Sequence, residues 1–490
     1  MDATTTLALP HVHFAPAQNW MNDPNGLVHV DGVYHLFFQY NPFGAEHAHM
    51  SWGHATSTDL LRWTEHGVAI PCRDDEEIYS GSAVVDTDNT SGLGAPGEAP
   101  IVAIYTSAAR PSRLQRQSLA YSTDGGRTWQ TYAHNPVLDR DSLEFRDPKV
   151  FRWTGGDDQY WVMVAVEAAD RQVVLYRSDD LISWRLLSTF GPAAAVGGVW
   201  ECPDLFPLAV DGDPNDVHWV LLVSLYPGGK AGGSATQYFI GTFDGTRFHC
   251  DAEPASDHDA RWLDHGRDCY AGVTYSGLPD DERTLIAWMS NWDYARVTPA
   301  VPSRGAMTIP RRLSLTRGLD GTLRLRQEPR LPAALPAAEA FADIELDTPW
   351  LVPAALPEAA LVELSVRFER AEGFAARIRH GEAGQDGVVI RVERGVLMVD
   401  RTQASGQWHP SLASVEVAPL TGDHRVDLRI VLDRSSIEVF ADDGTTVVTE
   451  LVYTEPGADA MTIEPLRGPA LVESLSIVDL TAVGANAAQS

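Results

Sequence analysis

The sequence is poor in cysteine and in long apolar stretches. Its four cysteines, at positions 72, 202, 250 and 269, are too few for a disulfide framework, and they include no C-x-x-C pair that would indicate a metal cluster. No stretch approaches the roughly 18 consecutive apolar residues of a membrane-spanning helix. We therefore expect reduced cysteines, no metal or other cofactor, and no membrane span.

Basic residues are also scarce. The chain has 37 Lys and Arg against 67 Asp and Glu, which gives a formal net charge of −30. Such a chain would be repelled by nucleic acid, by anionic membranes and by phosphorylated substrates, so a neutral ligand is the expected partner. Residues 1–9 show neither the basic segment nor the apolar segment of a signal peptide, which predicts a cytoplasmic protein.

Strands, rather than helices, are indicated along the chain. Apolar residues alternate with polar ones in short runs at 33–38, 83–85, 160–164 and 218–222, and Gly, Asp and Asn separate these runs. A chain of 490 residues exceeds what one hydrophobic core usually organises. We therefore expect an all-β protein with more than one domain.

A repeated motif suggests how the first domain is built. A turn bearing Ser or Thr and Asp precedes an aromatic residue four times, and these residues are Trp63, Trp129, Trp184 and Phe248, separated by 66, 55 and 64 residues. The Asp residues of these turns are expected only to stabilise them. Several short strands per repeat of this size predict a β-propeller with one antiparallel sheet per blade.

A second series of polar residues has similar spacing. Asp23, Ser80, Asp147, Glu201 and Asp268 are separated by 57, 67, 54 and 67 residues. We expect the innermost strand of each blade to bring one of these side chains to a shared central cavity, which predicts five blades. The runs around Asp147 and Glu201 are apolar or aromatic, where a carboxylate is costly unless it lines a wet cavity.

Three such carboxylates suit the cleavage of a glycosidic bond. Retaining glycosidases need a nucleophilic carboxylate and a protonated carboxylic acid about 5 Å apart. A metal site is a weaker alternative, because the histidines at 11, 13, 47, 49 and 54 match no strong zinc signature.

Seven separated motifs resemble those of glycoside hydrolase family 32, in the order in which that family carries them. They are N-W-M-N-D-P-N-G at 19–26, F-Q-Y-N-P at 38–42, S-W-G-H-A at 51–55, Y-S-G-S at 79–82, F-R-D-P-K at 145–149, W-E-C-P at 200–203 and W-M-S-N-W-D-Y-A at 288–295. The resemblance implies a five-bladed β-propeller followed by a β-sandwich, which hydrolyses β-fructofuranosides with retention of configuration.

The resemblance also implies roles for individual residues. Asp23 would be the nucleophile, Glu201 the general acid/base and Asp147 the transition-state stabiliser. The residues implied to surround a terminal fructose or the catalytic groups are Asn22, Gln39, Trp52, Tyr79, Ser80, Arg146, Tyr270 and Trp288. Trp52 and Trp288 have an equally good interpretation as core aromatic residues.

Two positions depart from the family pattern. His47 stands where a tryptophan is common, and P-S-R-G at 302–305 replaces the usual P-W-R-G. These departures leave the preference for a leaving group open. A fructosyltransferase would use the same residues and remains an alternative to a hydrolase, whereas a non-catalytic fructan-binding propeller would not need all three carboxylates.

The domain boundaries follow from composition. A Pro- and Ala-rich stretch from Leu331 to Ala342 indicates a linker, and alternation at 362–368 and 426–432 predicts sandwich strands. We therefore predict a catalytic propeller over 1–335, a linker over 336–345 and a β-sandwich over 346–490. The expected role of the sandwich is to cover part of the propeller surface. The pattern gives no oligomeric state.

Overall fold

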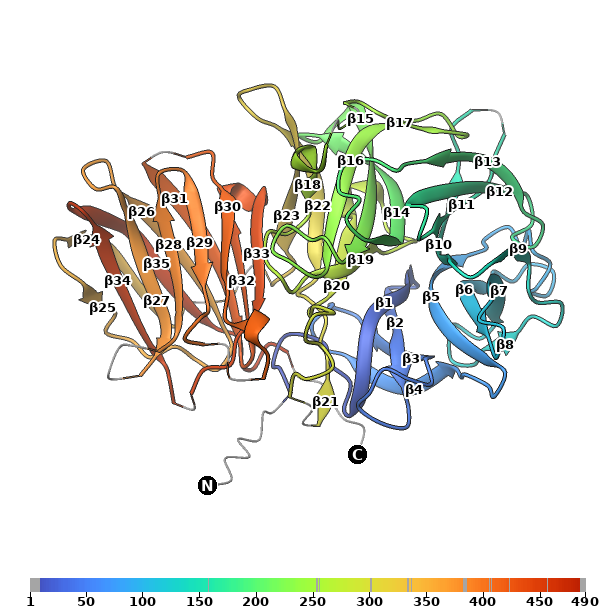
Figure 1. The fold of residues 1–490 in the computed structure, drawn as a ribbon, viewed down its shortest axis with the longest axis horizontal. Coiled ribbons are helices and arrows are strands. Elements are labelled where there is room, and N and C mark those ends of the chain that lie inside the picture. The colour runs from blue at the N-terminus through green and yellow to red at the C-terminus, as the bar shows by residue number, and fades with distance from the viewer. Residues whose placement is uncertain are drawn as a thin grey trace.

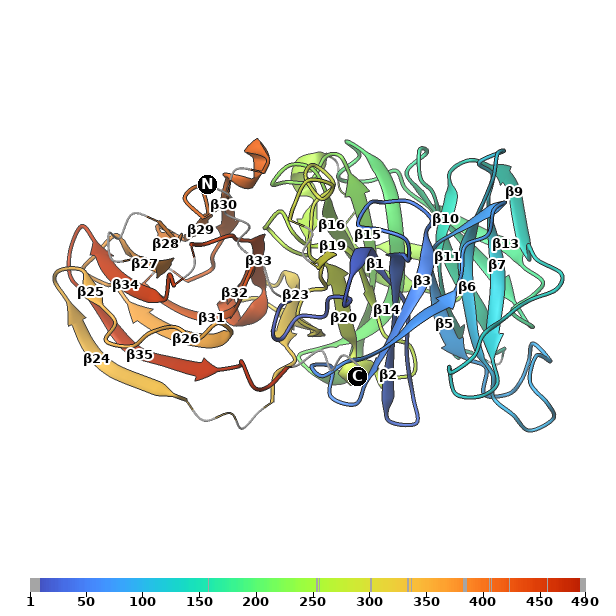
Figure 2. The same ribbon diagram turned by 90° about the horizontal axis from the view of Figure 1, so that it is seen from below.

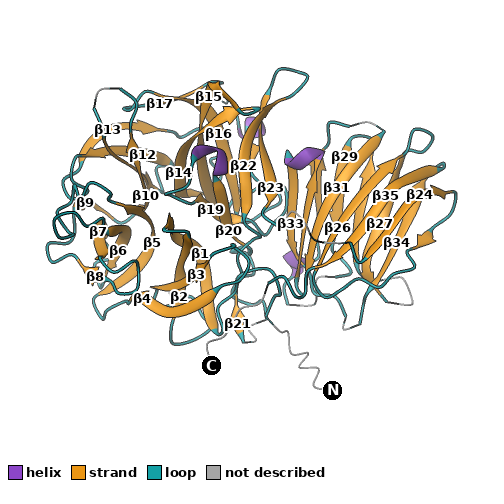
Figure 3. Cartoon of the chain, turned by 180° about the vertical axis from the view of Figure 1, so that it is seen from behind, coloured by secondary structure: helices purple, strands orange, loops and turns teal. Residues whose placement is uncertain are grey.

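A computed structural model describes residues 9–484 apart from 157, 253, 255, 300, 301, 333, 334, 336, 382–385, 405, 407, 423 and 456. The described residues form strands and short 3-10 helices but no α-helix, which confirms the predicted all-β class (Figure 3). No helix in this part of the chain is long and apolar enough to cross a membrane. The 3-10 helices are η1 (Asp257–Asp259), η2 (Asp280–Glu282), η3 (Pro410–Leu412) and η4 (Asp442–Gly444).

The first part of the chain is a five-bladed propeller, as predicted (Figure 1). Blade one is β1 (Asn19–Val30), β2 (Val33–Asn41), β3 (Ser51–Ser57) and β4 (Thr64–Ile70). Blade two is β5 (Glu76–Val85), β6 (Ile101–Ala109), β7 (Gln115–Ser122), β8 (Gln130–Thr131) and β9 (Leu138–Ser142). Blade three is β10 (Phe145–Trp153), β11 (Tyr160–Glu167), β12 (Gln172–Ser178) and β13 (Arg185–Phe190).

Blades four and five share one continuous sheet. Blade four is β14 (Val199–Val210), β15 (Asp213–Tyr226), β16 (Ala235–Phe243), β17 (Phe248–Cys250) and β18 (Arg261–Trp262). Blade five is β19 (Tyr270–Thr274), β20 (Thr284–Trp288), β22 (Arg311–Arg317) and β23 (Leu323–Pro329). The ring closes where β21 (Ser303–Arg304) pairs in parallel with the start of β1.

The repeated Asp and Trp turns stabilise the blades as predicted. In the second copy, Asp124 Oδ1 accepts hydrogen bonds from the backbone N–H groups of Arg127 and Thr128 at 3.0 and 2.9 Å. The indole N–H of Trp129 donates to the carbonyl of Gly126 at 3.1 Å. The same pattern holds around Asp59 and Asp180, so these aspartates are turn residues rather than site residues.

Every innermost strand carries a β-bulge in its first half. The register of each strand with its neighbour shifts between Met21 and Pro24, Ile78 and Gly81, Arg146 and Lys149, Glu201 and Asp204, and Tyr270 and Val273. A bulge leaves extra residues unpaired and turns their side chains away from the regular alternation. The five bulges therefore direct side chains from five blades to one level of the propeller axis.

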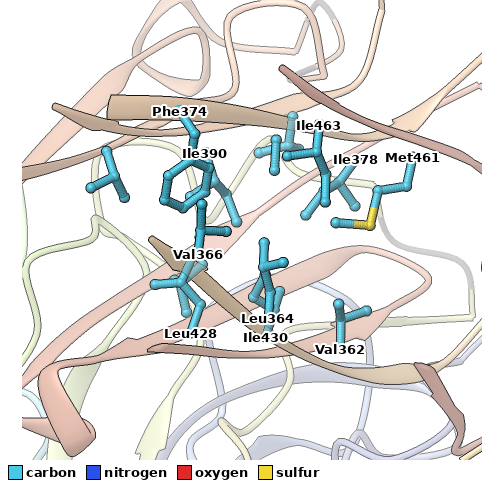
Figure 4. Close-up of a cluster of buried hydrophobic side chains, with 14 of the residues drawn as sticks. Val362, Leu364, Val366, Phe374, Ile378, Ile390, Leu428, Ile430, Met461 and Ile463 are labelled. Atoms are coloured by element: carbon cyan, nitrogen blue, oxygen red, sulfur yellow. The ribbon is translucent and has the colours of Figure 1, made fainter. Parts of the chain in front are cut away.

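The second domain is a sandwich of two six-stranded sheets, which Figure 2 shows one above the other. One sheet has the order β24 (Glu339–Leu346), β35 (Ala470–Asp479), β26 (Ala360–Arg367), β31 (Arg425–Asp433), β32 (Ser436–Ala441) and β33 (Thr446–Leu451). The other has β25 (Trp350–Leu351), β34 (Ala460–Leu466), β27 (Gly373–His380), β28 (Val388–Glu393), β29 (Val396–Asp400) and β30 (Val415–Pro419). Their inner faces meet in one core, where Val366 and Leu428 oppose Phe374 and Ile390 (Figure 4).

The predicted linker over 336–345 is wrong for most of its length. Residues from Glu339 onward form β24, which pairs antiparallel with β35 at the edge of the sandwich. Most of its side chains are exposed, so the strand lacks the hydrophobic alternation by which it would be recognised in the sequence. The sandwich therefore begins at Glu339 rather than at residue 346.

The two domains are joined by fully buried ion pairs. Arg311 of β22 lies 2.6 Å from Glu438 of β32, and Arg401, after β29, lies 2.7 Å from Asp268 of the propeller. All four side chains are inaccessible to solvent. Removing one partner of such a pair costs about 3–5 kcal/mol because the other charge stays buried without compensation. The domain interface is therefore fixed by specific charge pairing.

The N-terminal segment joins the same network through His13. Burial alone would lower the pKa of His13, but hydrogen bonds to Asp433 and Glu438 at 2.9 and 2.8 Å outweigh it and raise the pKa to about 9. A pKa raised above the unfolded value of 6.5 stabilises the fold fully below pH 6.5, and this contribution is lost as the pH rises through 9.

Replacing His13 should therefore destabilise the protein in a pH-dependent way. We expect His13→Gln to lower the free energy of unfolding on the order of 3 kcal/mol at pH 6, and by clearly less at pH 10. Thermal unfolding of both proteins at the two pH values measures this. His11→Gln is the control, because His11 pairs with the exposed Glu358. An equal loss from His13→Gln at both pH values would contradict the assignment.

Candidate active site

Asp23 lies in the bulge of β1, where N-D-P-N-G prevents regular pairing. Its carboxylate accepts hydrogen bonds from Ser80 Oγ at 2.7 Å and from Asn22 Nδ2 at 3.1 Å. Ser80 occupies the equivalent bulge of β5 in the next blade. Two neighbouring blades thus fix the orientation of one partly buried carboxylate.

Asp147 lies in the bulge of β10 with a left-handed backbone, φ 61°. A non-glycine residue in this region costs about 1–3 kcal/mol and persists only where its surroundings hold it. Here the backbone N–H of Asp147 donates to Thr106 Oγ1 at 2.9 Å, and the backbone N–H of Cys202 donates to Asp147 Oδ2 at 3.0 Å. The strained bulge points the carboxylate toward blade four.

Glu201 comes immediately before the bulge of β14 and is held from two sides. The Nε and Nη2 atoms of Arg146 lie 3.1 and 3.0 Å from Glu201 Oε1. The phenol of Tyr270 donates a hydrogen bond to the other oxygen, Glu201 Oε2. The side chain keeps 22% of its surface exposed, so its carboxyl group can exchange a proton with a bound molecule or with water.

The thiol of Cys202 lies between the other two carboxylates. Its Sγ atom is 3.6 Å from Asp23 Oδ2 and 3.6 Å from Asp147 Oδ2. Burial raises the pKa of Cys202 well above its usual value, and the nearby carboxylates raise it further, so the group stays a thiol and donates. The sequence did not predict this role for Cys202. A signal was present, since Cys202 directly follows Glu201 in the W-E-C-P motif.

The three carboxyl groups influence one another. Burial raises the pKa of Asp147, Arg146 opposes this effect, and the charges of Glu201 and Asp23 add to it. Burial likewise raises the pKa of Asp23 against its hydrogen bond from Ser80, with a further contribution from Glu201. Like charges this close do not all ionise readily, so the site favours holding a proton among its carboxyl groups.

The other predicted site residues fall into two groups. Asn22 accepts a hydrogen bond from the indole of Trp20 at 2.8 Å, and Tyr79, beside Ser80 in the bulge of β5, is partly exposed. Gln39 is nearly buried, and its amide donates to Asn25 Oδ1 and to the carbonyl of Ile78, which connects blades one and two. Asn22 and Tyr79 thus lie beside Asp23 and Ser80, and the contact of all three residues with a sugar stays a prediction.

Trp52 and Trp288 lie in the core behind the site. Both side chains are fully buried. The indole of Trp52 donates to the carbonyl of Tyr79 at 2.9 Å, and the ring of Trp288 packs against those of Trp20 and Trp292, which also contact each other. The structure therefore corrects their assignment as residues that contact sugar and supports their interpretation as core aromatic residues.

The prediction for Asp268 is also wrong. Its side chain does not reach the central site but is fully buried against Arg401 and Tyr294. The innermost strand of blade five begins two residues later, at Tyr270, and it is the phenol of Tyr270 that reaches Glu201. Regular spacing located the fifth strand within two residues but did not show which side chain faces the axis.

The two positions that depart from the family motifs both contact the start of β1. The ring of His47 meets those of Trp20 and Trp292 edge-on, with centroids 5.7 and 5.2 Å apart. Ser303 lies in β21, paired with Asn19. Among the described residues, no three His, Cys, Asp or Glu side chains are arranged to hold a metal ion.

Three interacting carboxyl groups on the axis of a propeller, one of them bound to an arginine and a tyrosine, are the site of a glycoside hydrolase. Comparisons with known proteins give the family. The model of the glycosyl hydrolases family 32 N-terminal domain matches residues 13–329, and that of the family 32 C-terminal domain matches residues 342–479. The chain belongs to glycoside hydrolase family 32.

Several relatives are similar over most of their length. A levanase from Bacillus subtilis is 40% identical over 487 residues, which cover 97% of this chain and 70% of the relative. The crystal structure of an exo-inulinase from Aspergillus awamori matches with a TM-score of 0.88 and 37% identity, over 96% of this chain and 99% of that one. A β-fructofuranosidase from Schwanniomyces occidentalis, complexed with fructosyl-erythritol, matches with a TM-score of 0.87 and 30% identity, over 97% and 98%.

The hydrogen bond from Ser80 predicts a pH effect. It stabilises the ionised form of Asp23, so Ser80→Ala should raise the pKa of Asp23 further and reduce the ionised fraction in acid. We expect the acid limb of kcat/KM to move upward by about one pH unit. Ser82→Ala is the control, because Ser82 Oγ accepts from the backbone of Val150 and contacts no carboxylate. An unmoved acid limb in Ser80→Ala would show that ionised Asp23 is not required.

Proposed function

We propose that this enzyme is an exo-acting β-fructofuranosidase that hydrolyses terminal non-reducing β-D-fructofuranosyl residues with retention of configuration. The observation that carries the proposal is the convergence of Asp23, Asp147 and Glu201 from three blades on one level of the axis. The substrate is a neutral saccharide such as sucrose, a fructo-oligosaccharide, levan or inulin. The family and the similarity to a levanase, an exo-inulinase and a β-fructofuranosidase support it.

In the first step, the carboxylate of Asp23 attacks the anomeric carbon of the terminal fructose. The bond from this carbon to the leaving oxygen breaks, and protonated Glu201 gives its proton to that oxygen. The fructose is then bound covalently to Asp23. Tyr270 and Arg146 hold the two oxygens of Glu201 in place, and Asp147 forms hydrogen bonds with fructose hydroxyls that strengthen in the transition state.

In the second step, Glu201 acts as a base. It removes a proton from water, and the water oxygen attacks the anomeric carbon and releases Asp23. Two inversions at one carbon leave its configuration unchanged. If the hydroxyl of a second sugar takes the place of water, the same residues produce a fructosyltransferase. Comparing free fructose with transfer products at low and high sucrose concentration separates the two activities.

Amide substitutions test the two central roles. Asp23→Asn and Glu201→Gln should each lower the turnover of sucrose by several orders of magnitude without changing the melting temperature, because the nucleophile or the proton donor is lost while size is kept. Glu144→Gln is a suitable control, since Glu144 is 45% exposed and contacts only the far side of Arg146, at 2.7 Å from Nη1. Near-normal turnover in Asp23→Asn would refute the mechanism.

The propeller axis is filled further along the same strands. Lys149 Nζ of β10 lies 3.1 Å from Asp204 Oδ2 of β14, and Thr274 Oγ1 of β19 donates to the same oxygen at 2.8 Å. All three residues are buried. A saccharide chain therefore cannot continue through the axis, and a fructose bound at the three carboxylates must be a chain end.

The filled axis predicts the products on long fructans. Free fructose should be the only early product from levan and from inulin, because only the leaving-group side of the terminal residue is open. Chromatography of the first few per cent of conversion measures this. Comparing the initial rates on the two polymers and on sucrose also gives the linkage preference. Oligosaccharides that appear before free fructose would contradict exo cleavage.

A further inference from the structure

A buried arginine of the sandwich domain contacts the propeller segment that leads to Tyr270. Arg401 follows β29, and its side chain is fully buried. Its Nη1 atom lies 2.7 Å from Asp268 Oδ2, and its Nη2 atom donates to Tyr294 Oη at 3.0 Å. Both partners belong to the propeller. One guanidinium group thus connects the sandwich to two separate propeller segments.

Other groups beside Arg401 also hold Asp268 and its neighbour. Asp268 Oδ1 accepts from Tyr294 Oη at 2.6 Å, and its Oδ2 also accepts from the backbone N–H of Leu451 in β33 at 2.8 Å. The backbone N–H of Asp268 donates to the carbonyl of Thr449 at 3.1 Å, and that of Arg267 donates to Glu450 Oε1 at 2.9 Å. The sandwich therefore fixes both the side chain and the backbone at positions 267 and 268.

Only Cys269, which is buried, separates this fixed segment from Tyr270. Tyr270 is the first residue of β19, and its phenol is the donor to Glu201 Oε2. Burial raises the pKa of Tyr270 well above its usual value, and the charge of Glu201 adds to this effect, so the phenol keeps its proton and donates. A shift of the segment at 268 would move this donor relative to Glu201.

We propose that Arg401 of the sandwich is a positioning residue for catalysis. Through Asp268 it fixes the start of β19, so that Tyr270 holds Glu201 where it can protonate the leaving group. The sandwich then contributes to the chemical step itself as well as covering the propeller. This inference rests on the proposed role of Glu201 as the acid/base.

His13 provides a comparison at the same interface. Its side chain is also fully buried, with Nδ1 2.9 Å from Asp433 Oδ2 and Nε2 2.8 Å from Glu438 Oε1. These partners lie on β31 and β32 and do not include residues 267–270 or Tyr294. Loss of His13 should weaken the domain interface without disturbing the donor to Glu201.

Comparing two substrates distinguishes a misplaced acid from a loss of folded enzyme. Sucrose needs a proton on its leaving oxygen, whereas fluoride leaves β-fructofuranosyl fluoride without one. The ratio of kcat/KM for sucrose to that for the fluoride does not depend on how much enzyme is folded. It therefore reports acid assistance even in a destabilised variant.

The experiment measures this ratio for the full-length enzyme and four variants. Glu201→Gln should lower the ratio by at least a hundredfold. Arg401→Gln should lower it on the order of tenfold, and Tyr294→Phe, which removes only the hydroxyl between Arg401 and Asp268, should lower it severalfold. His13→Gln should leave the ratio unchanged even if its melting temperature falls.

The outcomes distinguish the two proposals. If Glu201→Gln leaves the ratio unchanged, Glu201 is not the acid and the proposed function fails. If Glu201→Gln lowers the ratio but Arg401→Gln and Tyr294→Phe do not, the positioning role of Arg401 is refuted while the proposed function stands. An equal fall in His13→Gln and Arg401→Gln would also refute it, because loosening of the interface in general would then be the cause.

Discussion

The β-bulges of the five innermost strands are the constraint on which the site depends. A regular strand would place Asp23, Asp147 and Glu201 at heights set by alternation alone, but each bulge interrupts its strand at an equivalent place. Each carboxylate on the axis makes ionisation of the other two less favourable. Arg146, Tyr270 and Cys202 donate the hydrogen bonds that offset this effect. The chemistry follows from a repeated irregularity of the backbone.

The same balance of buried charge governs the contact between the domains. Arg311 and Arg401 each pair with buried carboxylates of both domains, and His13 pairs with two buried carboxylates of the sandwich. Buried ion pairs of this kind add little net stability, but a displaced partner is costly, so they fix one relative placement of the domains. The sandwich thereby acts on the propeller segment that leads to Tyr270, at a distance from the substrate.

Much of this architecture was predictable from the sequence, because it follows from local patterns. The repeated turns predicted the blades, the second series of polar residues predicted their number, and the motifs predicted the family. The prediction for Asp268 was wrong because spacing located the fifth strand only to within two residues, and Asp268 lies before the strand begins. The prediction of a linker at residues 339–345 was wrong because an exposed edge strand shows no alternation of apolar and polar residues. Its partner strand, β35, lies more than a hundred residues away in the sequence. Arg401 and Cys202 went unnoticed because their contacts exist only in the folded chain.

The central claim is that Asp23, held by Ser80 and Asn22, forms a covalent bond with fructose. Mass spectrometry of peptides from the Glu201→Gln variant, quenched during turnover of β-fructofuranosyl fluoride, tests it most directly. This variant forms the intermediate without needing an acid and then hydrolyses it slowly for want of a base. The account predicts one fructosyl group on the peptide that contains Asp23, attached at that residue. An adduct on Asp147, or no adduct together with a product of inverted configuration, would contradict it.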